Sequence, residues 1–197
     1  HLYTILLVTC YSEGELGLRT TLDSLVATEY DDMQKLILVI ADGLITGSGN
    51  DRSTPDCLVD MIELAHDRFE EWHFDPQGRP HPYSYLAVGD GAKRHNQARV
   101  YAGYYRHGGH CAPVILVVKC GSGEEEAKQA KPGNRGKRDS QIILMNFLNK
   151  CLFDDRMSPL EYDLFFKIYR LTGILPDHYE VVLMVDADTR VAPTSLD

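Results

Sequence analysis

The stretch VVLMVDADTRV, residues 181–191, runs from apolar residues directly into Asp186 and Asp188. Continuous apolar runs of this length are typical of strands covered on both faces in a parallel sheet. We therefore expect residues 181–185 to form a buried strand that ends in two carboxylates one residue apart. Such an ending requires a reason to keep two negative charges together.

Three further runs have the same character: TILLV (4–8), KLILVIA (35–41) and PVILVVK (113–119). Between the runs lie helical patterns at 13–28, 54–72, 138–153 and 158–173. Thr54 is the expected N-cap of the second pattern, with Pro55 in its first turn. The last begins at Ser158-Pro159 and ends at Gly173. Strands that alternate with helices predict an open, mostly parallel α/β sheet flanked by helices.

Two segments interrupt this alternation. Residues 73–112 are rich in Gly, Pro, His and Tyr, and we expect loops there, with room for a hairpin. Residues 121–136 are polar and charged, and no regular element is expected.

The composition narrows the class of protein. The chain has 197 residues, 44% of them hydrophobic, and a formal charge of −9, which argues against a general nucleic-acid or anionic-membrane surface. The five cysteines form no CxxC pair, so we expect a reducing compartment, with Cys10 and Cys120 packed as small hydrophobic side chains. No signal peptide or membrane-spanning run is visible, so we expect this segment to be soluble and cytosolic. The chain opens in a strand and closes just past a motif, as an excised piece of a longer protein would.

The predicted strands share one functional edge. In open α/β sheets ligands bind at the carboxyl ends of the strands. Thr9–Glu13 follow the first run, Asp42 follows the second, and Lys119 closes the third. Together with Asp186 and Asp188 they predict a polar rim at one edge of the sheet.

Two carboxylates as close as Asp186 and Asp188 repel one another unless a cation lies between them. Carboxylate oxygens suit Mg²⁺ or Mn²⁺, which are commonly shared with substrate phosphates. The alternative is a solvated turn, because an Asp-x-Asp pattern arises easily by chance in an acidic chain.

KPGNRGKRDSQ, residues 131–141, gathers Lys131, Arg135, Lys137 and Arg138 in an otherwise acidic protein. A flexible cationic loop leading into a helix near Asp139 predicts a phosphate site. The alternative is a charged loop that is simply exposed. The sequence contains no P-loop, dinucleotide fingerprint, Gly-x-Ser-x-Gly elbow or zinc-protease spacing.

Six stretches carry a family resemblance: VTCYSEGELGLRTTLDSL, VIADGLITGSG, STPD, VVKCG, KPGNRGKRDSQIILMNFL and VDADTRVAPTSL. Together they resemble the catalytic domain of fungal chitin synthases, which are processive family-2 glycosyltransferases with a GT-A fold. With DDRMSPLEYDLF (154–165), the stretch from Lys131 resembles the large classes, including those with a myosin-like head. The resemblance implies that residues 1–197 are the N-terminal donor-binding part of a GT-A domain that is incomplete at its C-terminus. The parent would transfer GlcNAc from UDP-GlcNAc to the 4-hydroxyl of growing chitin, with inversion, at the cytoplasmic face of the plasma membrane or of secretory vesicles.

The resemblance also implies roles for particular residues. Asp186 and Asp188 would hold Mn²⁺ or Mg²⁺ against the diphosphate. Nucleotide-sugar contacts would come from Thr9, Tyr11, Glu13, Asp42, Lys119, Lys137, Arg138 and Asp186. The general base and the Gln-Arg-Arg-Arg-Trp acceptor motif are expected beyond Asp197, so this piece alone is expected to be inactive.

The expected partners are UDP-GlcNAc and, in the parent, growing chitin and a membrane bound through segments absent here. No nucleic acid is expected, and a homo-oligomer is allowed. Two rival hypotheses are a catalytically silent nucleotide-binding or assembly module and an Asp-x-Asp-x-Thr phosphohydrolase. The second is disfavoured because the fifth position of its pattern is Arg190.

Overall fold

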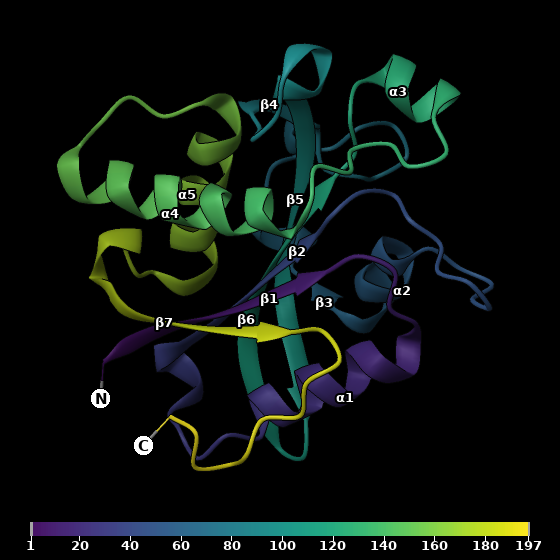
Figure 1. Ribbon diagram of the computed structural model, residues 1–197. Coiled ribbons are helices and arrows are strands. Elements are labelled where there is room, and N and C mark those ends of the chain that lie inside the picture. The colour runs from purple at the N-terminus through teal and green to yellow at the C-terminus, as the bar shows by residue number, and fades with distance from the viewer. Residues whose placement is uncertain (1, 197) are drawn as a thin grey trace.

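A computed structural model describes residues 2–196. Its centre is a seven-stranded sheet with the order β3-β5-β6-β2-β1-β7, and β4 pairs with β5 (Figure 1). The strands are β1 (Tyr3–Cys10), β2 (Lys35–Ala41), β3 (Glu63–Leu64), β4 (Tyr83–Leu86), β5 (His95–His107), β6 (His110–Lys119) and β7 (Tyr179–Asp186). The helices are α1 (Glu15–Val26), α2 (Thr54–Met61), α3 (Gly123–Lys128), α4 (Lys137–Phe153) and α5 (Pro159–Thr172). Short 3₁₀ turns span Asp32–Gln34, His66–Arg68, Glu71–His73, Gly91–Arg94 and Pro176–His178.

The four predicted strands are confirmed as β1, β2, β6 and β7, and they lie side by side in parallel. β1 pairs with both β2 and β7, and β2 pairs with β6. Their carboxyl ends therefore meet at one edge of the sheet, as the sequence predicted.

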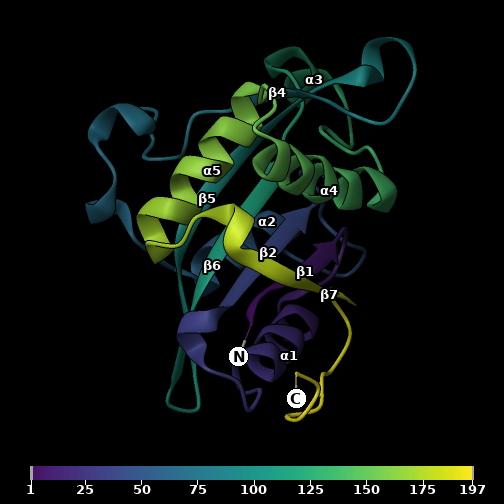
Figure 2. The same cartoon turned by 90° about the vertical axis from the view of Figure 1, so that its left-hand side faces the viewer.

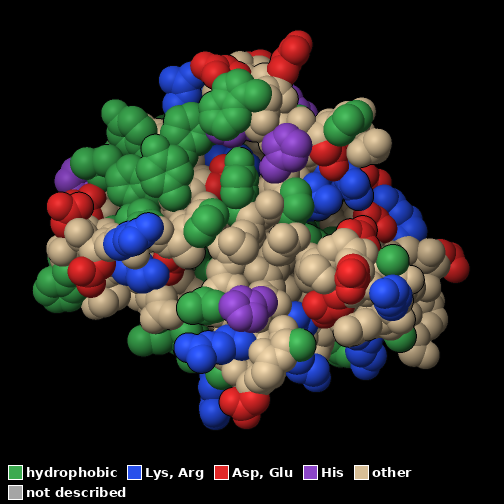
Figure 3. Space-filling model, turned by 90° about the horizontal axis from the view of Figure 1, so that it is seen from above, with side chains coloured by type: hydrophobic (Ala, Val, Ile, Leu, Met, Phe, Trp, Pro, Cys, Tyr) green, Lys and Arg blue, Asp and Glu red, His purple; other side chains and the backbone are tan. Residues whose placement is uncertain are grey.

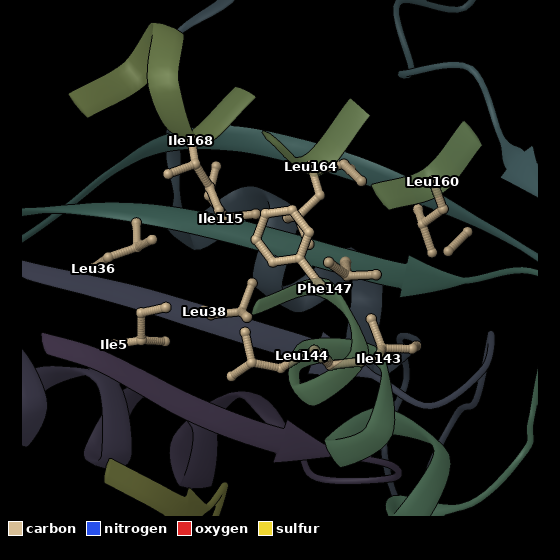
Figure 4. Close-up of a cluster of buried hydrophobic side chains, with 14 of the residues drawn as sticks. Ile5, Leu36, Leu38, Ile115, Ile143, Leu144, Phe147, Leu160, Leu164 and Ile168 are labelled. Carbon is tan, nitrogen blue, oxygen red and sulfur yellow. The ribbon is translucent and has the colours of Figure 1, made fainter. Parts of the chain in front are cut away.

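Helices cover both faces of this sheet, which confirms the α/β class and agrees with a GT-A-like architecture (Figure 2). Residues of α4 and α5, such as Phe147 and Leu164, pack on Ile5 and Leu38 of one face (Figure 4). Residues of α1 and α2 pack on the opposite face, against Leu6 among others. Alternate residues of β1 thus enter opposite cores, which explains its uninterrupted apolar sequence.

The expectation that residues 181–185 are buried is wrong. Val181, Val182 and Met184 are 39%, 38% and 55% exposed, whereas Ile5 and Leu6 of neighbouring β1 are 0% exposed. The reason is position, because β7 ends the sheet and pairs with β1 alone among the described strands. An apolar run predicts a strand, but it does not tell whether other elements cover both faces of that strand.

The predicted helix at 54–72 is much shorter than expected, since α2 ends at Met61. Beyond it, Glu63 pairs with Tyr104, and the N–H of Ala65 donates to Ala102 O at 3.0 Å, so the chain joins the sheet instead. Ser53, rather than Thr54, is the N-cap, and its hydroxyl accepts a hydrogen bond from the N–H of Asp56 at 3.2 Å.

The irregular segment expected at 73–112 contains the longest strand of the sheet. β5 has 13 residues and forms a hairpin with β6 from Ala98↔Lys119 to His107↔His110. Gly108 and Gly109 make the turn at φ values of 58° and 89°, which favour glycine. Within 121–136, where no regular element was expected, six residues form α3.

The other predicted helices are confirmed. α5 begins with a capping box between Ser158 and Glu161 and ends at Thr172, with Gly173 as its C-cap at a φ of 73°. α4 begins at Lys137, one residue before the helical pattern expected at 138–153, with Gly136 as an N-cap that contributes no side-chain hydrogen bond.

The packing expected for two of the cysteines is confirmed. All five cysteines are free, and Cys10 and Cys120 are buried. On the face seen in Figure 3, basic and acidic side chains are interspersed, and hydrophobic side chains gather on one side. Within residues 2–196 no helix has the length and apolarity needed to cross a bilayer.

Candidate functional site

A cavity of about 460 Å³ opens at the carboxyl ends of β1, β2 and β7. The strand register places these ends level, because Thr9 pairs with Asp186 and Cys10 pairs with Ala41. The lining residues come from these ends and from the start of α4: Thr9, Cys10, Tyr11, Glu13, Asp42, Asn134, Gly136, Lys137, Ser140, Asp186 and Asp188. The acidic residues of the predicted rim therefore face one common space, whereas Lys119 is not among the lining residues.

Asp42 lies at the base of the cavity and is 4% exposed. Its carboxylate accepts hydrogen bonds from Asn134 Nδ2 (2.9 Å) and from the backbone N–H groups of Arg135 and Gly136 (2.8 Å each). Buried carboxylates are stable only when their oxygens are satisfied in this way. Asp42 thereby fixes the loop that leads into α4.

Lys119 is the fourth partner of the Asp42 carboxylate, but it lies beneath the cavity. Its side chain is 0% exposed, and its ammonium is 2.9 Å from Asp42 Oδ1 and 2.7 Å from Asp139 Oδ2. Asp139 also accepts hydrogen bonds from the Tyr85 hydroxyl and the Val88 N–H, both at 2.8 Å. Burial, aided by the charge of Asp139, raises the pKa of Tyr85 far above its ordinary value, so this hydroxyl remains a donor. Lys119 is thus placed to join the two acids to one another.

The cationic loop is less free than its composition suggested. The guanidinium of Arg135 is 3% exposed and pairs with Glu125 Oε1 at 2.8 Å. This hydrogen bond is the main cause that holds the pKa of Glu125 below its ordinary value. Arg138 is exposed and is absent from the lining residues. Lys131 lies over the Tyr11 ring, 5.4 Å from its centroid.

The loop after β1 forms another part of the cavity wall. The backbone N–H of Tyr11 donates to Glu13 Oε2 at 2.6 Å, and the Thr54 hydroxyl donates to Glu13 O at 2.8 Å. Burial, with smaller effects from Glu13 and Asp42, raises the pKa of the Cys10 thiol well above its ordinary value. Cys10 is therefore a neutral part of the wall and not a nucleophile.

Asp186 and Asp188 are exposed at the mouth of the cavity, on either side of buried Ala187. The ammonium of Lys137 forms an ion pair with Asp186 Oδ1. Among residues 2–196 no group of three or more His, Cys, Asp or Glu side chains is arranged to hold a metal ion. Two carboxylates fit an ion that keeps water and takes further oxygens from a phosphate, as Mg²⁺ and Mn²⁺ do.

Two lining residues escaped the sequence analysis as individuals. Asn134 lies within the quoted cationic loop, but its partner Asp42 is 92 residues away. Ser140 is 0% exposed, and its hydroxyl has no hydrogen-bond partner within the described structure. Its only sequence signal is a place in the first turn of a predicted helix, which gives no direction for the side chain.

The comparisons with known proteins agree with one another. A family model described as chitin synthase matches residues 1–197. The chain is 53% identical to chitin synthase 3 of Candida albicans over 203 aligned residues, which cover 98% of this chain and 16% of that protein. It is 52% identical to chitin synthase 4 of Neurospora crassa, with the same coverage. It is 51% identical to chitin synthase 3 of Saccharomyces cerevisiae, covering 99% of this chain and 17% of that protein. The chain therefore spans about a sixth of the length of these relatives.

Proposed function

Because this chain belongs to the chitin synthase family, we propose that the cavity between β1, β2, β7 and α4 binds the nucleotide-sugar donor of a glycosyltransferase. The donor is UDP-GlcNAc, and the chain is the N-terminal donor-binding part of a GT-A domain. The observation that carries the proposal is the meeting of Asp42, Asp186, Asp188 and Lys137 around one space. Acids grouped with a cation suit a ligand that contains both phosphate and metal.

In the reaction of the full protein, the 4-hydroxyl oxygen of growing chitin forms a bond to C1 of GlcNAc. The bond from C1 to the diphosphate breaks, and UDP leaves with the bonding electrons. The acceptor proton passes to a general base that we expect outside residues 1–197. Catalysis of such a displacement depends on relief of the charge that develops on the leaving diphosphate.

Asp186 and Asp188 would hold Mn²⁺ or Mg²⁺, which supplies part of this charge relief when bound. Lys137 supplies a mobile positive charge at the same place, since its side chain is half-exposed on the cavity wall. Thr9, Tyr11 and Glu13 form the wall available to the nucleoside. Arg138 is exposed and does not line the cavity, so we assign it no direct contact with the donor.

For Asp42 and Lys119 the geometry supports a supporting role beneath the donor. Asp42 has four hydrogen-bonding partners from other parts of the chain, and Lys119 is fully buried. We therefore propose that both residues hold the cavity floor in place and that, of the two, only Asp42 borders the donor. In the full protein the acceptor side and the membrane attachment would be provided by other segments.

Calorimetric titration of the chain with UDP-GlcNAc, with and without MnCl₂, tests the proposal. We expect binding that strengthens with Mn²⁺, and loss of this dependence in Asp188→Ala. Asp155→Ala is the matched control, because it removes an exposed acid from the α4–α5 connection, away from the cavity lining. Binding unaffected by Mn²⁺ would refute the metal assignment, and no binding would favour the silent assembly module. Chitin synthesis by the isolated chain would contradict the expectation that it lacks the base.

A further inference from the structure

The two acids proposed to hold the metal differ in their surroundings. Asp186 is already paired with the ammonium of Lys137, a residue 49 positions away on α4. Within residues 2–196 the carboxylate of Asp188 has no ion pair or hydrogen bond. Only Asp186 has a protein cation that a metal would have to displace.

Lys137 can leave Asp186 without movement of the backbone. It is the first residue of α4, and the preceding N–H groups of Arg135 and Gly136 are held by Asp42. Its side chain is 55% exposed, so rotation of that side chain alone carries the ammonium away from the acid. Asp42 offers no new place for it, since its oxygens already have partners.

Two cations compete for one carboxylate. While the Lys137 ammonium contacts Asp186 Oδ1, a divalent ion there must displace it or suffer its repulsion. A diphosphate in the same cavity gives the ammonium a second anionic partner and frees Asp186 for the metal. A ligand that removes a competitor in this way must itself bind more tightly when the metal is present, since binding linkage is reciprocal.

We propose that Lys137 moves from Asp186 to the diphosphate of the donor, and that this lysine exchange makes metal binding depend on nucleotide binding. The inference rests on the proposed function, because it requires a metal at Asp186 and Asp188 and a diphosphate beside them. It adds an order of events: the nucleotide-free protein holds metal weakly, and the nucleotide prepares the metal site.

The test measures the affinity for Mn²⁺ alone, with MnCl₂ as the probe and the electron paramagnetic resonance signal of free Mn²⁺ as the readout. We expect Lys137→Met to bind Mn²⁺ about two- to fivefold more tightly than the unaltered chain, the range that an exposed ion pair controls. Lys128→Met is the matched control, because Lys128 is 74% exposed on α3 and absent from the cavity lining, so its loss should leave the affinity unchanged. Circular dichroism checks that each variant is folded.

A second titration uses UDP. In Lys137→Met we expect weaker UDP binding without metal, and a smaller increase in Mn²⁺ affinity when UDP is added. A lysine that only contacts phosphate would weaken UDP binding but leave the affinity for Mn²⁺ alone unchanged, and that result overturns the lysine exchange while the proposed function stands. Absence of Mn²⁺ binding to the unaltered chain, even with saturating UDP, overturns both.

Discussion

Lys119 provides the sharpest test of how the site is supported. Lys119→Met keeps the length and apolar stem of the side chain but removes the ammonium between Asp42 and Asp139. Both acids are nearly inaccessible, at 4% and 1% exposed, so water cannot replace the lost cation. The variant therefore leaves two buried negative charges with hydrogen bonds but without a counter-ion.

Removal of one partner from a buried ion pair costs about 3–5 kcal/mol, because the remaining charge is uncompensated. Methionine fills most of the volume, so little of this loss would come from a cavity. For a chain of this size, we expect a fall in melting temperature of roughly 6–20 °C. Lys128→Met is the control: its ammonium is 3.9 Å from Glu124 and both side chains are exposed, so its loss should cost about 1 kcal/mol or less.

Urea unfolding followed by circular dichroism gives the free energies of unfolding. Adding Asp139→Asn to Lys119→Met removes one of the unpaired charges, so the double variant should be more stable than the sum of the single losses predicts. The reasoning would be refuted if Lys119→Met cost less than about 1 kcal/mol and the double variant showed no such coupling.

Two further predictions concern the loop that Asp42 anchors. The lowered pKa of Glu125 means that its pair with Arg135 stabilises the fold fully above about pH 4.3 and is lost as the pH falls through the lower, folded-state pKa. Glu125→Gln should therefore lower the urea midpoint more at pH 6 than at pH 3, and an equal deficit at both would contradict this. Gly133→Ala should melt well below Gly78→Ala, although their φ values are 76° and 75°, because only at Gly133 would the added Cβ lie 2.4 Å from Lys119 O. We expect a difference of about 1–3 kcal/mol, and equal melting temperatures would disprove the close contact.

The parallel centre of the sheet was predictable because its pattern is local. Ile5 and Leu6 enter opposite cores, so neither can be polar, and the same holds along β2 and β6. Parallel strands end at the same edge, so the meeting of Asp42 with Asp186 followed from chain direction alone.

β5 was not predictable from its composition. This strand uses Ala, Gly and Tyr where the central strands use Val, Ile and Leu. Gly103 shows why: a Cβ there would lie 2.3 Å from Glu63 O, so the close pairing with β3 requires glycine. A glycine needed for the close approach of two backbones looks the same in the sequence as a glycine needed for a turn.

The ion-pair partners of the charged side chains could not be predicted from the sequence either. Arg135 and Lys137 are two residues apart in one basic stretch, yet one is locked to Glu125 and the other reaches Asp186. Local sequence gives the charge, while the partner depends on packing between distant segments. Lys119 was predicted at the correct edge because it closes a parallel strand. Its burial beneath the cavity was not foreseen, because that depends on packing.

The position of β7 has a consequence for how the acidic pair can be lost. Asp186 closes a strand that, within residues 2–196, is hydrogen-bonded on one side only. An edge strand opens at a lower free-energy cost than the middle of a sheet. Asp186 and Asp188 can therefore be displaced while β1, β2 and β6 stay intact. The other edge of β7, whose backbone groups pair with no described strand, is also a template on which another extended segment can add. An additional strand at that margin would brace the acidic pair without touching it.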